Sequence, residues 1–198
     1  MKLYITTPSP FARKVRIVAH EKGLFERIEE IAVDPYANAP ELLATNPVVQ
    51  VPTLIAEDGL PLTDSPVICE YLDAIGSGAR LLPAEGAERL RVKRLETLAN
   101  ATLEMGVKLV LEKRRPEAEQ SPTWIARWTF NMGRALDALE AAAPSADDFN
   151  IGVLSAGVAV SWVSFRHPDY DWKTGRPHLV ALQAALEQRP SFLATVPV

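Results

Sequence analysis

The pattern of apolar residues changes its period once along the 198-residue chain, between Gly76 and Pro83. Before this stretch, short runs typical of strands alternate with helical segments. After it, apolar residues recur with the 3.6-residue spacing of amphipathic helices. The sequence therefore predicts two domains, residues 1–76 with mixed α/β structure and residues 85–198 with helices only.

The first domain is predicted to follow the order β-α-β-β-β-α. The Asp58-Gly59 turn indicates a hairpin between its last two strands. A proline-rich stretch around Pro35, Pro40 and Pro47 is expected to be irregular. The expected strands are residues 2–6, 27–33, 53–57 and 60–63, and the expected helices are residues 11–22 and 67–74.

The second domain is predicted to contain four long helices, with Ser121 and Asn150 as N-caps of the second and third. The third helix is uncharged and apolar, but it is shorter than the roughly 20 residues that span a bilayer, so we expect it to be buried in a bundle. Pro190 is expected to close the last helix. The predicted helices are residues 85–115, 122–139, 151–165 and 178–188.

Composition excludes several functional classes. The chain has 21 basic and 25 acidic residues, so it lacks the positive field that nucleic-acid binding needs. Its single cysteine, Cys69, excludes an internal disulfide and a dithiol redox pair, and it fits a reducing compartment. The first sixteen residues lack the apolar run of a signal peptide. We expect a cytoplasmic protein that binds neither nucleic acid nor membranes.

Three motifs stand out in the first domain: Ser9-Pro10-Phe11 with Arg13, Asn46-Pro47 with Val51-Pro52-Thr53-Leu54, and Asp64-Ser65-Pro66 with Glu70-Tyr71-Leu72. They resemble the motifs of the soluble glutathione transferases, in the same order and at the same spacing. The resemblance covers the whole chain and is greatest to short bacterial members with a catalytic serine. It implies a thioredoxin-like domain followed by an all-helical bundle, glutathione as co-substrate, no other cofactor, and a homodimer.

Ser9 admits two interpretations. It precedes Pro10 at a strand-to-helix turn, where a serine ordinarily caps the helix. A helix N-terminus also favours an anion and lowers the pKa of a nearby thiol. The resemblance implies that the Ser9 hydroxyl donates a hydrogen bond to the glutathione sulfur and keeps it as thiolate, without itself acting as nucleophile.

A serine hydrolase and a metal site find little support. The chain has three histidines, His20, His167 and His178, and it contains neither a G-x-S-x-G elbow nor H-E-x-x-H spacing. We therefore expect no metal ion, and we expect His20 to be a packed or half-exposed residue of the first helix.

The remaining glutathione contacts are implied by the resemblance. A cis peptide bond at Pro52 would leave the backbone of Val51 free to pair with the cysteinyl residue, as in strand addition. Asp64 and Ser65 would hold the ammonium and carboxylate of the γ-glutamyl end, although Ser65 could equally be only a helix cap. Gln50 would contact the glycyl carboxylate.

One departure from the family pattern and a set of candidates for the acceptor site complete the prediction. The family usually has glycine before the position of Gln50, whereas this chain has Val48-Val49. The acceptor site of the family lies between the two domains. The candidates for an apolar electrophile site, each of which could equally be core, are Phe11, Met105, Leu109, Trp162 and Phe165.

The predicted function is conjugation of glutathione to a soft apolar electrophile. Two alternatives stay open: a non-catalytic glutathione-binding or regulatory protein on the same fold, and glutathione-dependent reduction of a peroxide or disulfide. The second usually employs a cysteine at the position of Ser9.

Overall fold

The computed structural model describes residues 1–197 and divides into two compact units. One unit is Met1–Leu82 together with the segment from Arg189 onward, and the other is Pro83–Gln188. The C-terminal segment thus packs with the first unit, which its apolar pattern does not indicate. The Glu21 carboxylate binds it by accepting hydrogen bonds from Arg189 (2.8 Å) and Ser191 (2.5 Å).

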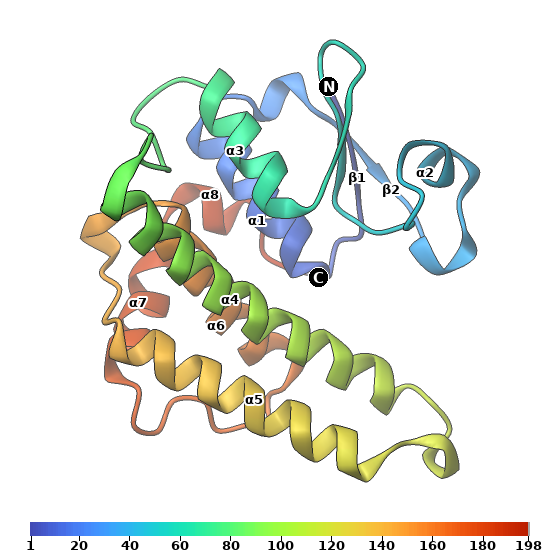
Figure 1. The fold of residues 1–198 in the computed structure, drawn as a ribbon, viewed down its shortest axis with the longest axis vertical. Helices are drawn as coiled ribbons and strands as arrows, with labels where there is room; N and C mark the ends of the chain where they lie inside the picture. The colour runs from blue at the N-terminus through green and yellow to red at the C-terminus, as the bar shows by residue number, and fades with distance from the viewer. Residues whose placement is uncertain (198) are drawn as a thin grey trace. The chain divides into compact units, whose positions relative to one another are not determined.

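The first unit contains a four-stranded sheet with the order β2-β1-β3-β4 (Figure 1). β1 pairs with β2 in parallel and with β3 antiparallel, and β3 pairs antiparallel with β4. Helices α1 and α3 pack against each other on one side of the sheet, and α2 lies on the other. The elements are β1 (Lys2–Ile5), α1 (Pro10–Glu21), β2 (Glu29–Ala32), α2 (Pro40–Thr45), β3 (Thr53–Ile55), β4 (Pro61–Thr63) and α3 (Ser65–Ile75).

This order confirms the predicted thioredoxin-like β-α-β-β-β-α fold with one correction. The stretch expected to be irregular contains the short helix α2, preceded by a 3-10 turn at Pro35–Ala37. Pro40 occupies the first turn of α2, where the missing N–H costs nothing, and Glu41 follows with a charge that suits a helix N-terminus. Three prolines in this stretch concealed a helix of six residues.

The second unit consists of helices, as predicted. α4 packs against both α5 and α6, and every residue of α6 from Ile151 to Val163 is buried. α4 and α6 approach closely at Gly106, where a Cβ atom would lie 2.6 Å from the Trp162 ring. The helices are α4 (Gly86–Lys113), α5 (Pro122–Ala141), α6 (Ile151–Arg166) and α7 (Pro177–Leu186), with 3-10 turns at Glu117–Glu119 and Ala146–Asp148.

The helix boundaries confirm two predicted caps and correct one end. Ser121 accepts a hydrogen bond from the Trp124 N–H, and Asn150 accepts from Gly152 and Val153. Pro190, expected only to close the last helix, instead begins α8 (Pro190–Leu193) in the first unit. A proline in the first turn is compatible with a helix start because its fixed φ is helical.

A buried polar cluster ties the C-terminal ends of α1 and α3 to the chain that follows α3. The Lys22 ammonium lies 3.1 Å from Asp73 and donates to Ala79 O, while Asp73 accepts from the N–H groups of Leu81 and Leu82. Burial by itself would raise the pKa of Asp73, but these donors outweigh it and hold that pKa below its usual value. The cluster leaves the Asp73 carboxylate fully hydrogen-bonded.

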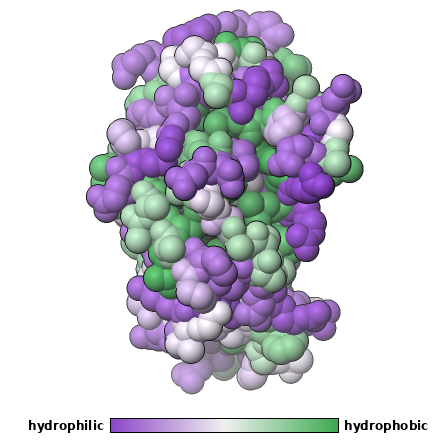
Figure 2. Space-filling view, turned by 90° about the vertical axis from the view of Figure 1, so that its left-hand side faces the viewer, coloured by the Kyte–Doolittle hydropathy of each residue, from purple (hydrophilic) through white to green (hydrophobic). Residues whose placement is uncertain are grey.

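Exposed apolar side chains are interspersed with polar ones on the face seen in Figure 2. Among the described residues, no helix is long and apolar enough to cross a membrane. The exposed large apolar residues of the second unit include Leu90, Trp124 and Phe130, the last two beneath the guanidinium groups of Arg127 and Arg134.

Candidate functional site

The register of the sheet brings the three sequence motifs to one end of its strands. This row of strand ends is called the edge below. Tyr4 pairs with Thr53, which pairs with Thr63, so β1 ends, β3 begins and β4 ends at the same edge. The segments that carry Ser9, Val51-Pro52 and Asp64-Ser65 adjoin these strand ends. Because neighbouring strands lie about 4.8 Å apart, β1 and β4 are separated by roughly 10 Å at this edge.

Ser9 is the N-cap of α1, as one of its two interpretations predicted. Its Oγ accepts a hydrogen bond from the Ala12 N–H at 3.2 Å, and its carbonyl accepts from Arg13 N–H at 3.0 Å. Capping uses a lone pair of the hydroxyl oxygen and leaves its hydrogen, which finds no acceptor among residues 1–197. The cap is therefore compatible with donation to a ligand at the same helix end.

The Val51-Pro52 peptide bond is cis, as the resemblance implied. β3 starts only at Thr53, and within the described residues the Val51 N–H and C=O make no hydrogen bond to other backbone groups. Both groups are thus available to an extended ligand at the edge. Gln50 precedes them with an exposed side chain.

Asn46, a residue of the second sequence motif, holds the loop before β3 in place. Its side-chain N–H2 donates to Gln50 O (3.0 Å) and to Thr53 Oγ1 (2.9 Å), and its Oδ1 accepts from Val48 N–H (3.1 Å). Thr53 Oγ1 in turn donates to Gln50 O at 2.9 Å. The Asn-Pro pair ahead of the strand was the signal for this role, but its partners become neighbours only in the folded loop.

Val49 stands where the resemblance leads us to expect glycine, and its backbone conformation is one that favours glycine. Its φ is 51°, in the left-handed region, where a β-branched side chain is strongly disfavoured. The chain retains this conformation although it has valine there. The loop around Gln50 is therefore strained and still reaches the cis-proline turn.

Ser65 does not cap α3, so the capping interpretation is wrong. The helix begins at Ser65 itself, and the N-cap residue is Asp64, with φ 69° and no side-chain capping bond. Ser65 is only 1% exposed, and its Oγ finds no hydrogen-bond partner. A buried hydroxyl without a partner is costly, and at a helix N-terminus it forms a ready site for an anionic group.

The carboxylate of Asp64 is exposed beside Ser65. Within residues 1–197 its side chain forms no hydrogen bond or ion pair. An unpaired carboxylate next to an anion-binding helix end can hold the two charges of an α-amino acid group together.

His20 is too far along α1 to act as a base for Ser9, and the His167 ring is bound within the second unit. His20 lies eleven residues further along α1, roughly 16 Å at 1.5 Å per residue. Burial, and then the nearby Arg16 guanidinium, lowers its pKa, and its ring stacks on Phe25 at 3.8 Å. His167 belongs to the second unit, where its Nε2 lies 3.1 Å from Gly106 O and burial lowers its pKa. No group of three potential metal ligands occurs among the described residues.

The electrophile candidates fall into two sets. Phe11 is half-buried in the first turn of α1. In the second unit, Met105 and Leu109 lie on α4, and Trp162 is buried against Gly106 of the same helix. Phe165 is 38% exposed, with the Arg166 guanidinium 4.5 Å from its ring centroid. Leu109 and Trp162 are fully packed, which is typical of core residues.

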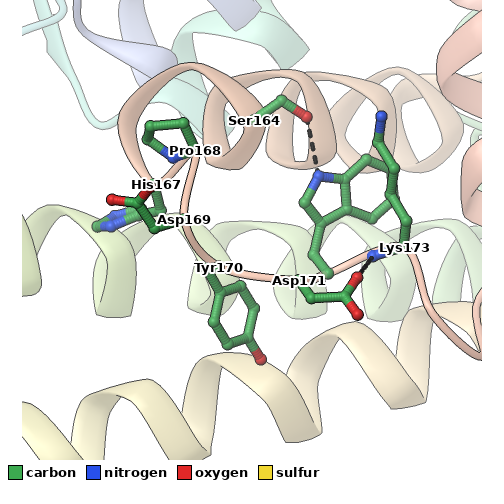
Figure 3. A pocket seen from close by; sticks show the side chains of 8 residues that line it. Ser164, His167, Pro168, Asp169, Tyr170, Asp171 and Lys173 are labelled. Carbon is green, nitrogen blue, oxygen red and sulfur yellow. Dashed lines mark hydrogen bonds between the residues drawn. The ribbon is translucent and has the colours of Figure 1, made fainter.

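A hollow of about 380 Å³ lies at the loop that follows α6 (Figure 3). Trp172 Nε1 donates to Ser164 Oγ across it at 2.9 Å, and Tyr170 points towards α5, where a Cβ at Gly133 would lie 2.7 Å from its hydroxyl. None of the five electrophile candidates lines this hollow. Its lining residues are Ser164 and His167–Lys173.

Comparisons with known proteins find a matching family and a relative that covers the whole chain. Residues 8–75 match the family described as Glutathione S-transferase, N-terminal domain. The uncharacterized GST-like protein YibF of Escherichia coli K12 is 36% identical over 202 residues, covering 100% of this chain and 98% of the relative.

Two solved structures are similar over their whole length. A glutathione transferase family member from Pseudomonas fluorescens Pf-5 with bound glutathione has 34% identity and a TM-score of 0.95, covering 100% of this chain and 98% of that one. A glutathione S-transferase from Methylobacillus flagellatus with GSH bound has 34% identity and a TM-score of 0.88, covering 100% and 99%.

Proposed function

Because the chain belongs to the glutathione transferase family, we propose that it binds glutathione at the edge formed by β1, β3 and β4 and conjugates it to a soft apolar electrophile. Three groups at this edge carry the proposal, because none of them has a hydrogen-bond partner in residues 1–197. They are the Ser9 O–H, the Val51 backbone and the Ser65 Oγ. Structures of similar proteins with bound glutathione support it.

The dimensions of the edge suit a tripeptide. Three residues in extended form span roughly 10 Å, which matches the separation of β1 and β4. In this arrangement the γ-glutamyl carboxylate accepts from Ser65 and the α3 N-terminus, and its ammonium pairs with Asp64. The cysteinyl backbone pairs with Val51, and the glycyl end lies at Gln50.

Ser9 would then activate the thiol. The α1 N-terminus and the Ser9 O–H both favour the thiolate, so the thiol releases its proton to solvent at a lower pH than free glutathione. With an aryl halide, the thiolate sulfur forms a bond to the ring carbon, and the halide leaves with the electron pair of the broken bond. No base from the protein is required for this sequence.

Further features are proposed from the family alone. We place the acceptor near Phe11, Met105 and Phe165, the candidates that are not fully packed, and we expect a cytoplasmic homodimer without another cofactor. The domain predicted at residues 1–76 would bind glutathione, and the domain predicted at residues 85–198 would contribute the acceptor site through its part in the second unit, Pro83–Gln188.

Two measurements test the proposal. Millimolar glutathione should raise the melting temperature, since a ligand that binds only the native state stabilises it. Turnover of a chlorodinitrobenzene with glutathione tests conjugation. Stabilisation without turnover would favour the non-catalytic alternative, and reduction of a peroxide or mixed disulfide would favour the reductase. No stabilisation at any glutathione concentration would overturn the proposed site.

A further inference from the structure

Every charged side chain between Ile28 and Ala79 is acidic. This segment contains all of the proposed glutathione contacts except Ser9. Two of its carboxylates lie at the edge that carries the site, because Asp34 follows the end of β2 and Asp64 follows the end of β4. An anionic ligand group at this edge therefore finds no cationic side chain in this segment.

The basic residues of the first unit are engaged elsewhere. Lys2 starts β1 at the opposite edge of the sheet, and Arg13 and Lys14 are buried within α1, with Arg13 against the Phe192 ring. The others form ion pairs with carboxylates of the same unit: Arg16 with Glu30, Arg27 with Glu57, Lys22 and Arg80 with Asp73, and Arg189 with Glu21.

Gln50 is the polar side chain left to meet the glycyl end. Its backbone carbonyl is fixed by Asn46 and Thr53, while its amide is exposed. An amide N–H2 donates both to a carboxylate oxygen and to the carbonyl oxygen of an amide or ester. The bond to the carboxylate is the stronger of the two, but without a cation the difference is smaller than an ion pair would give.

We infer that this site does not select for a charged glycyl carboxylate. Its substrate class then includes glutathione derivatives in which that carboxylate is neutral, as an amide or ester. This inference rests on the proposed function for the placement of the tripeptide, and it adds a specificity that the placement alone does not require.

The test compares S-methylglutathione with its glycinamide on the full chain by calorimetry at pH 7. The dissociation constants for the native protein should agree within about threefold, because a neutral exposed amide distinguishes the two weakly. Gln50→Lys should make the carboxylate ligand bind about tenfold more tightly than the amide, through a charge-assisted hydrogen bond.

The ratio of the two constants is the readout, so a general loss of folded protein does not affect it. Glu26→Gln is the matched control: it changes the net charge by the same amount, but Glu26 precedes β2 at the opposite edge of the sheet. That variant should keep the native ratio.

Three outcomes would overturn the inference. A native protein that prefers the carboxylate ligand by tenfold or more uses a cation that the first unit does not supply, and the proposed function stands. An unchanged ratio in Gln50→Lys would remove Gln50 from the glycyl end. Absence of binding by both ligands would overturn the proposed function and this inference together.

Discussion

The two ends of helices α1 and α3 differ in how completely their polar groups are hydrogen-bonded. At the C-terminal ends, Glu21, Lys22 and Asp73 are each bonded to two or more partners, and the exception is His20 Nε2, which is buried without a hydrogen-bond partner. At the N-terminal ends, the Ser9 O–H and the Ser65 Oγ have no acceptor or donor within residues 1–197. Because buried polar groups are normally paired, the unpaired end is the one suited to a ligand and the paired end serves stability.

The largest expected effect lies at the paired end. Asp73→Asn leaves the Lys22 ammonium buried beside a neutral amide, and the free energy of unfolding should fall by about 3 kcal/mol or more at pH 7. Chemical denaturation measures this value. The affinity of the remaining folded protein for glutathione should be unchanged, and a selective loss of affinity would contradict the division between the two ends.

The same carboxylates predict an acid-sensitive stability. The pKa values of Glu21 and Asp73 are lowered in the folded protein, so the unfolded chain binds protons more readily. Their contribution is present above the ordinary carboxylate pKa of about 4 and is lost as the pH falls through and below that value. The stability difference between the native protein and Asp73→Asn should therefore shrink between pH 6 and pH 3, and a constant difference would argue against this origin.

At the unpaired end, Ser9→Gly should lower turnover and leave stability almost unchanged. Glycine caps almost as well as serine, so stability should fall by only a few tenths of a kcal/mol. Loss of a donor to the thiolate should raise the pKa of bound glutathione by about 1–2 units towards 8.5, which lowers turnover near pH 6 roughly 10- to 100-fold. Thiolate absorbance against pH measures the pKa. An unchanged titration in the folded variant would leave the α1 N-terminus as the activating group.

Ser65→Ala should affect binding without affecting stability. Since the Ser65 Oγ has no partner, its removal should leave the melting temperature unchanged or slightly higher, which an N-cap would not allow. The affinity for glutathione should fall about tenfold with little change in turnover at saturation, because the contact is distant from the sulfur. Asp64→Gly, which tolerates the φ of 69°, should give the same pattern, and a lost maximal rate in either variant would contradict the assignment.

The smallest effect is expected at Val49. Val49→Gly removes the penalty of a left-handed valine and should raise the free energy of unfolding by about 1 kcal/mol, after the added entropy of glycine in the unfolded chain is subtracted. Thermal unfolding measures the change. Val49→Ala is the control, because it retains a Cβ at positive φ and should gain less. A destabilised glycine variant would show that the valine side chain makes compensating contacts.

The sequence by itself determined the elements whose cause is local. The Asp58-Gly59 turn, the N-caps at Ser9, Ser121 and Asn150, and the buried apolar helix α6 follow from dihedral preferences and apolar period, and the structure confirms them. The order of the first domain was likewise predictable, because its strand and helix signals are separated by clear turns.

Only the tertiary structure decided which polar groups are left unpaired. Ser9-Pro10 and Ser65-Pro66 have the same local pattern, yet Ser9 caps its helix and Ser65 does not, because the chain enters α3 from β4 through Asp64 at positive φ. The roles of Asn46 and of the segment from Arg189 onward depend on partners distant in the chain or across a folded loop. A hydrogen bond that joins such partners leaves no periodic trace in the sequence, so it could be found only once the chain was folded.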